Sequence, residues 1–285
     1  MNSLAKRLAL FASIEPGTAL WGREISQLGA DTVYEKLCQG GYDTVAYASL
    51  IERLTHFDLD RTFAEIAESK ARFIIPGTAE WPDALDDLEV PPIGIIVKGN
   101  LDSLTGPALA IVGTRNPTQY GSRIAGDFAA GFVDREWNIV SGGAYGIDSA
   151  AHRGALVAEG RTVAVIASGI DIQYPAGNAR LFDEIVENGA IISEVVPGVP
   201  ALPHRFLTRN RIIAALSQAT LVVEAAFRSG SLRTARDAAE LMRPVMAIPG
   251  PISSPTSEGC HRLIGERAAE LVTSVADAFE LVSAL

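Results

Sequence analysis

Apolar runs that recur along most of the chain constrain its fold more than any other feature of the sequence. Each run is followed by a Gly-rich or polar loop and then by a stretch with helical periodicity. Because the runs are apolar on both faces, they are typical of parallel strands covered by helices on both sides. The sequence therefore predicts an α/β fold with a doubly wound, mostly parallel sheet. The runs occupy residues 72–76, 93–99, 108–114, 137–143, 162–169, 190–195, 219–225 and 244–250.

The first 66 residues show no β-like alternation and read as short helices separated by turn signals. Within them, residues 58–73 have the pattern of a capped helix that begins at Asp58 or Asp60. We therefore predict a small helical domain over 1–66 and an α/β domain over 67–285. The apolar stretch that follows Lys6 and Arg7 is short and lacks a cleavage site, so we interpret it as a helix and the protein as cytoplasmic. No apolar run approaches the roughly 18 residues of a membrane-spanning helix, so we expect no membrane association.

The charge distribution favours an anionic ligand at one place. The net charge is −10, yet residues 205–243 carry seven arginines against three acidic residues. The sequence lacks the glycine fingerprint of dinucleotide binding and the lysine-containing phosphate loop of ATPases, so we expect no cofactor. Cys38 and Cys260 have no chelating pattern around them, so we expect no metal site.

The segment SGGAYGIDSAAH, residues 141–152, places three glycines directly after an apolar run. Glycines at a strand-to-helix turn let backbone N–H groups approach an anion, so this loop predicts phosphate binding. Asp148 and His152 follow four residues apart and share a helix face. They are either a general base oriented by a carboxylate or a structural pair, and we favour the structural interpretation. Trp81, Trp137 and Tyr174 are candidate stacking platforms for bases, although Trp137 begins an apolar run and is better explained as core.

Six ordered segments resemble the signature blocks of the DNA-processing protein A family, also called DprA or Smf. They are 110–121, 141–156, 164–181, 206–217, 222–238 and 247–264, within a match over roughly 72–275. The resemblance implies an extended Rossmann-like domain, preceded in many members by a small helical SAM-like domain. It further implies binding of single-stranded DNA, homodimerisation and loading of the recombinase RecA in natural transformation, with no catalytic residues.

The resemblance also assigns binding residues to this sequence. The family's DNA-contacting arginine corresponds to Arg115, and the family's arginine-rich and serine-rich blocks supply further contacts, since the guanidinium fork suits phosphate. The nucleic-acid and phosphate-binding residues so predicted are Gly113, Thr114, Arg115, Ser141, Gly142, Gly143, Gly146, Arg209, Asn210, Arg211, Ser229, Gly230 and Ser231.

Some positions depart from the family pattern. Val196 stands in place of a proline, Ala215 and Met242 in place of glycines, and His261 in place of an asparagine. The sequence ends at residue 285 without the C-terminal winged-helix-like domain of many members, so we expect that domain to be absent. These departures leave open whether the protein acts in transformation, in general recombination or as a DprA-like component of a phage-defence system.

An enzymatic alternative is a nucleotide phosphoribohydrolase, because the motif of that family would fall on residues 229–237. Arg233 and Asp237 then stand where the motif needs a glycine and a glutamate, which disfavours hydrolysis. For assembly, apolar residues recur with near-helical spacing over 261–282, which we interpret as one helix. Its apolar face either packs back on the sheet or joins two chains, and we predict a dimer interface at Leu263, Ile264 and Leu271.

Overall fold

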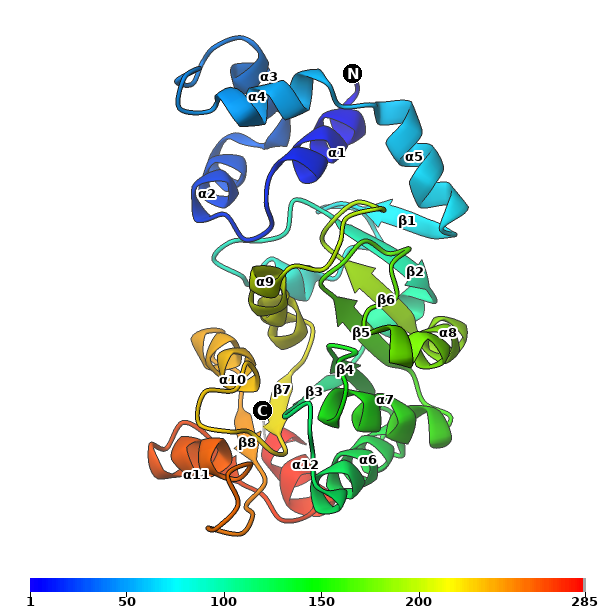
Figure 1. Cartoon of the computed structure of the whole chain (residues 1–285), viewed down its shortest axis with the longest axis vertical. Helices are drawn as coiled ribbons and strands as arrows, with labels where there is room; N and C mark the ends of the chain where they lie inside the picture. Colours follow the sequence, from blue (N-terminus) through cyan, green and yellow to red (C-terminus); the bar gives the residue numbers. More distant parts are fainter. Residues whose placement is uncertain (284–285) are drawn as a thin grey trace. The chain divides into compact units, whose positions relative to one another are not determined.

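The computed structural model describes residues 1–283 and divides them into two compact units (Figure 1). The first unit contains residues 1–98, 167–172 and 193–208, and the second contains 99–166, 173–192 and the described residues from 209 onward. The helical start of the chain thus shares its unit with the first two strands.

Five helices open the first unit, as the turn pattern predicts. The last of them is capped by Asp58, whose carboxylate accepts a hydrogen bond from the backbone N–H of Arg61 at 3.0 Å, so the predicted cap is confirmed. The helix ends at Glu68, however, and residues 71–73 of the predicted helix lie in the first strand. Leu10, Val33 and Leu37 are fully buried in the core that these helices enclose. The helices are α1 (Ser3–Ser13), α2 (Ala19–Leu28), α3 (Ala30–Cys38), α4 (Ala48–Thr55) and α5 (Leu59–Glu68).

The same unit contains β1 (Ala71–Ile74) and β2 (Ile95–Gly99), which pair antiparallel with Phe73 opposite Ile96. Both lie where apolar runs predict strands. Their antiparallel pairing is why the sheet of the chain is mostly, and not entirely, parallel.

The strands of the second unit follow the order β6-β5-β4-β3-β7-β8-β9. The pairs β3–β4, β4–β5, β3–β7, β7–β8 and β8–β9 are parallel, so their carboxyl ends meet at one edge and the predicted α/β class is confirmed. All five residues of β3 and of β5 are buried, as runs apolar on both faces require. The strands are β3 (Ala108–Val112), β4 (Asn138–Ser141), β5 (Thr162–Ile166), β6 (Ala190–Ser193), β7 (Ala219–Val222), β8 (Val245–Ala247) and β9 (Glu270–Leu271).

Helices follow most of these strands, and α6 and α7 pack side by side on the sheet (Figure 1). Phe128 and Phe132 of α6, Ile147 of α7 and Ala278 of α12 join the core formed with β3 and β4. The helices from here to the end of the described chain are α6 (Gln119–Val133), α7 (Ile147–Val157), α8 (Ala179–Asn188), α9 (Pro203–Ala215), α10 (Ser231–Glu240), α11 (Glu258–Gly265) and α12 (Val275–Ser283). Three short 3-10 turns lie at Asp83–Leu85, Leu101–Leu104 and Ala176–Asn178.

The interpretation of 261–282 as one amphipathic helix is wrong. Helix α11 ends at Gly265, the two-residue strand β9 follows, and a second helix begins only at Val275. Leu263 is 7% exposed and Ile264 is half-buried, whereas Leu271 is 50% exposed. The near-helical spacing therefore combines core positions of two helices with an exposed strand residue, and Leu263 offers no surface to a second chain.

Met242, where the family usually has glycine, occupies the left-handed backbone region with φ of 57° just after α10. Its N–H donates to Ala239 O at 2.9 Å, and the N–H of Arg243 donates to Ala238 O at 2.9 Å. These bonds form the helix-ending turn in which glycine is the favoured residue, so the methionine adds strain there.

Candidate nucleic-acid interface

Three loops at the carboxyl edge of the second unit carry most of the predicted binding residues. They follow β3 (residues 113–118), β4 (142–146) and β7 (223–230). Direct backbone bonds join them: Thr114 N–H donates to Glu224 O at 2.6 Å, and Ile147 N–H donates to Thr114 O at 3.1 Å. The structure therefore brings together residues that are about a hundred positions apart in the sequence.

The glycines after β4 make room for the protein's own atoms. Gly146 has φ of 82° and ψ of −125°, and a Cβ there would lie 2.3 Å from Thr114 O and 2.7 Å from Arg115 O. Gly143 has φ of 67°, and a Cβ there would lie 2.6 Å from the Phe182 ring. The sequence suggests that a ligand needs this space, but contacts within the fold already require glycine. Phosphate binding by this loop stays a prediction.

Beneath the loop, the guanidinium of Arg209 packs on Gly142. A Cβ at Gly142 would lie 2.0 Å from Arg209 Nη1. Arg209 is 6% exposed and donates to the carbonyl oxygen of Val165. Asp148 accepts hydrogen bonds from the backbone N–H groups of Gly142 at 3.2 Å and Ala144 at 3.4 Å. A carboxylate of the protein itself therefore takes the bonds that the sequence analysis expects an anionic ligand to receive.

The opposite charges of Asp148 and Arg209 stabilise each other in this buried cluster. Burial raises the pKa of Asp148, while the nearby Arg209 opposes the shift. Burial lowers the pKa of Arg209 to about 10, and Asp148 opposes that shift in turn. Each residue thus reduces the cost of burying the other's charge.

His152 has a structural role in the same region. Its Nδ1 lies 2.7 Å from Thr162 Oγ1, and the Thr162 hydroxyl donates to Ile139 O at 2.9 Å, so Nδ1 must be the donor to Thr162. Burial lowers the pKa of His152 to about 3. Because Asp148 binds backbone N–H groups, the structure supports the structural interpretation of both residues over the acid–base pair. We call Gly142, Asp148, His152 and Arg209 the buried support.

The structure also brings the arginine-rich block of α9 to the loop after β7. Asn210 Nδ2 donates to Gly230 O at 3.2 Å, and Asn210 is 7% exposed. Arg211 is half-buried, and the Ser229 and Ser231 hydroxyls lie 2.7 Å apart. Gly113, Thr114 and Ser229 are half-buried, Ser141 and Ser231 are buried, and Gly230 is exposed.

At the surface of the same edge, Arg115 is exposed and Tyr145 is 48% exposed. We call these two residues the exposed rim. The sequence analysis missed Tyr145, although its position among glycines in the loop was a usable signal. Of the three proposed stacking platforms, Tyr174 is 48% exposed and Trp81 is 5% exposed. Trp137 packs edge-on against Phe132 in the core, as expected.

The family model for DNA recombination-mediator protein A matches residues 72–283. This chain belongs to that family. A relative from Streptococcus pneumoniae, DNA processing protein DprA, is 45% identical over 197 residues, covering 69% of each chain. The DprA of Bacillus subtilis is 35% identical over 84% of this chain and 81% of its own. A Mycobacterium tuberculosis relative is 52% identical over 64% of this chain, but the match covers 46% of that relative's length.

Solved structures of the DNA recombination-mediator protein A family agree with the fold. The S. pneumoniae DprA structure superimposes with a TM-score of 0.76 at 40% identity, covering 82% of this chain and 81% of that one. DNA processing protein A from Helicobacter pylori, described for its single-stranded DNA binding mode, superimposes with a TM-score of 0.68 at 29% identity. That match covers 75% of this chain and 97% of the H. pylori chain.

The residue that stands in place of the glutamate in the phosphoribohydrolase motif is buried. Asp237 is 4% exposed, and Arg233 Nε donates to it at 2.6 Å across one turn of α10. Burial raises the pKa of Asp237, and Arg233 opposes the shift. A carboxyl group enclosed in this way is poorly placed to reach a nucleotide.

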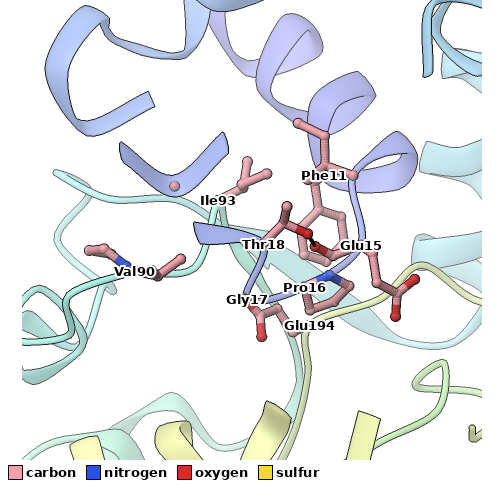
Figure 2. Close-up of a pocket in the computed structure, with 11 residues that line it drawn as sticks. Phe11, Glu15, Pro16, Gly17, Thr18, Val90, Ile93 and Glu194 are labelled. Atoms are coloured by element: carbon pink, nitrogen blue, oxygen red, sulfur yellow. Dashed lines mark hydrogen bonds between the residues drawn. The ribbon is translucent and has the colours of Figure 1, made fainter. Parts of the chain in front are cut away.

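The first unit contains a pocket that is lined by none of these residues (Figure 2). It encloses about 300 Å³ including space open to solvent, between the α1–α2 turn and residues 90–93. Its walls include Phe11 and Ile93, and its carboxylates are Glu15 and Glu194. Arg205 binds Glu15 at 2.6 Å, so part of the acidic charge is compensated.

Within residues 1–283, no group of three or more His, Cys, Asp or Glu side chains is arranged to hold a metal ion. None of the helices in this range is both long and apolar enough to cross a bilayer.

Proposed function

We propose that this protein binds single-stranded DNA, protects it and loads a RecA-type recombinase onto it, as in natural transformation. Membership of the recombination-mediator family supports this, as does the H. pylori relative described for single-stranded DNA binding. The structural observation that carries the proposal is Arg115, an exposed residue whose backbone lies against Gly146 of the glycine loop. Arginine there can give a phosphate two parallel hydrogen bonds.

The binding step is tested by filter binding with single-stranded and duplex DNA of one length. Arg135→Ala is the matched control, because Arg135 is also an exposed arginine but lies beyond the far end of α6, at the opposite edge of the sheet. Preference for single strands, weakened by Arg115→Ala and unchanged by Arg135→Ala, supports the proposal. Equal binding of duplex, or equal effects of the two variants, contradicts it.

The recombinase step needs its own measurement. DNA-dependent ATP hydrolysis by a RecA-type recombinase on single strands coated with single-strand-binding protein should rise when this protein is added. The rise should be smaller with Arg115→Ala. No rise with the wild-type protein, under conditions where it binds DNA, rejects the loading role and leaves the binding role intact.

We further propose that the protein is not an enzyme and acts in the cytoplasm as a homodimer. Release of free base from nucleoside monophosphates or of phosphate from ATP, lost in Asp237→Ala, would contradict the proposal that the protein is not an enzyme.

For assembly, Leu271 on the edge strand β9 is the exposed member of the predicted interface. Leu271→Arg should convert a dimer into a folded monomer by light scattering, and a variant that stays dimeric places the interface elsewhere.

A further inference from the structure

Tyr145 is the most exposed residue of the glycine loop, although its surroundings are buried. Tyr145 is 48% exposed, while its neighbours Ala144 and Gly146 are half-buried and Gly143 and Ile147, two positions away, are buried. Single exposed aromatic residues are common on proteins and need no explanation by themselves. What distinguishes Tyr145 is that the fold fixes its ring in place.

The Tyr145 hydroxyl is bound by the turn that precedes α8. Gly177 N–H donates to Tyr145 Oη at 3.2 Å, and a Cβ at Gly177 would lie 2.5 Å from that oxygen. The turn is itself tied to the glycine loop, because Asn178 Nδ2 donates to Gly143 O at 2.9 Å and to Ser149 Oγ at 2.8 Å. The ring is therefore anchored at both ends, by its backbone and by its hydroxyl, while half of its surface faces solvent.

Tyr145 also lies beside the phosphate-binding arginine of the proposed function. The next residue, Gly146, packs directly on the backbone of Thr114 and Arg115. Two exposed side chains of complementary chemistry, a guanidinium and an aromatic ring, thus come from loops in contact. A single strand presents both a phosphate and an unpaired base at each nucleotide, and proteins bind such strands by pairing cationic grooves with aromatic platforms.

We propose that Tyr145 is a binding residue that stacks on a base of the single strand whose backbone Arg115 contacts. This inference rests on the proposed function. A ring already held by the fold loses little conformational freedom on binding, and a tyrosine face accepts any base. Stacking at this position therefore adds affinity without sequence preference.

Oligothymidine and an abasic oligonucleotide of the same length separate stacking from phosphate contact. Tyr145→Ala should weaken oligothymidine binding by about tenfold, since loss of one stacked base costs roughly 1–3 kcal/mol. The same variant should bind the abasic strand as the wild type does. Tyr145→Leu should lose nearly as much, because it keeps apolar volume without a π face, whereas Tyr145→Phe should retain most of the affinity for oligothymidine.

Fluorescence of 2-aminopurine placed in the oligonucleotide gives a second readout. Wild type and Tyr145→Phe should quench it on binding, and Tyr145→Leu should quench it less at saturating protein. Equal losses of Tyr145→Ala on oligothymidine and abasic strands, or unchanged affinity and quenching in Tyr145→Leu, overturn the assignment. Wild-type protein that binds neither strand contradicts the proposed function and this inference together, so the two failures are distinguishable.

Discussion

The buried support and the exposed rim contain similar residue types, but the structure uses them in opposite ways. Arg209 is covered, faces Asp148 and packs on Gly142, whereas Arg115 is exposed on a loop that touches the same glycine segment. The sequence analysis predicts DNA contact for both arginines. The difference teaches that an arginine in a predicted binding motif can be buried as part of the loop's own structure. Changes in the support should act on stability first, and changes in the rim on binding.

The largest effect is expected from Arg209→Met, which keeps the side-chain volume and removes the charge. Asp148 would then lose its stronger cationic neighbour and keep only the weaker influence of Arg115. Breaking one partner of a buried pair typically costs about 3–5 kcal/mol. Urea denaturation should show a loss of this order. Arg135→Ala should lose far less, because it removes only a surface hydrogen bond to Gly131 O and a contact with the Phe279 ring. If Arg209→Met instead keeps wild-type stability and loses only DNA affinity, Arg209 belongs to the rim and the comparison fails.

The next effect is a pH dependence from His152. Its folded-state pKa is about 3 against an ordinary 6.5, so the folded state binds fewer protons. The stability due to neutral His152 is present above pH 6.5 and is lost as pH falls from there towards 3. His152→Asn keeps an N–H for Thr162 but does not titrate. Between pH 7 and 5 the wild type should lose about 2 kcal/mol more than the variant.

Urea denaturation of wild type and His152→Asn at pH 7 and pH 5 measures this difference in unfolding free energy. The two proteins share all carboxyl groups, so the contribution of those groups cancels in the comparison. Parallel pH profiles of wild type and His152→Asn would mean that His152 is not held neutral by the fold. In that case His152 would not belong to the buried support.

Arg115→Ala should change stability little, because Arg115 attracts the Asp148 charge but repels that of Arg209. It should weaken binding of single strands by roughly fivefold, a cost of about 1 kcal/mol. Loss of one phosphate contact should also reduce the salt slope of log K by about 0.7. Filter binding across a salt series measures both. A loss of stability comparable with that of Arg209→Met would remove the distinction between rim and support.

The smallest effect lies outside both regions. Met242 is 91% exposed with φ of 57°, so Met242→Gly should relieve backbone strain and stabilise the protein by roughly 0.5–1 kcal/mol. DNA affinity should not change, which makes the variant a test that stability and binding can be separated. A gain in stability accompanied by altered affinity would show that α10 couples to the interface.

The long buried strands could be predicted from the sequence because each is apolar on both faces for several residues. Strand β9 could not, since it has two residues and both are exposed. The prediction of one helix over 261–282 failed in the same region. Apolar spacing does not show where a helix ends, and here the helix ends at Gly265.

The candidate site was predictable as a set of loops but not as a set of contacts. Glycines and arginines mark the loops after β3, β4 and β7. The sequence does not show that the Asp148 carboxylate accepts the hydrogen bond from the Gly142 N–H. Nor does it show that Arg209, 61 positions after Asp148, packs on Gly142. Burial of a charged side chain depends on partners distant in sequence, and motif spacing does not record them.

The pairing of Arg209 with Asp148 has a kinetic consequence. Adjacent opposite charges cancel at a distance, so this arginine adds little to the long-range field that draws a polyanion towards an acidic protein. In the proposed function, capture of DNA then depends on exposed cations such as Arg115, and its association rate should fall steeply with ionic strength. Dissociation, by contrast, should respond more to groups that act only at close range, among them the ring of Tyr145.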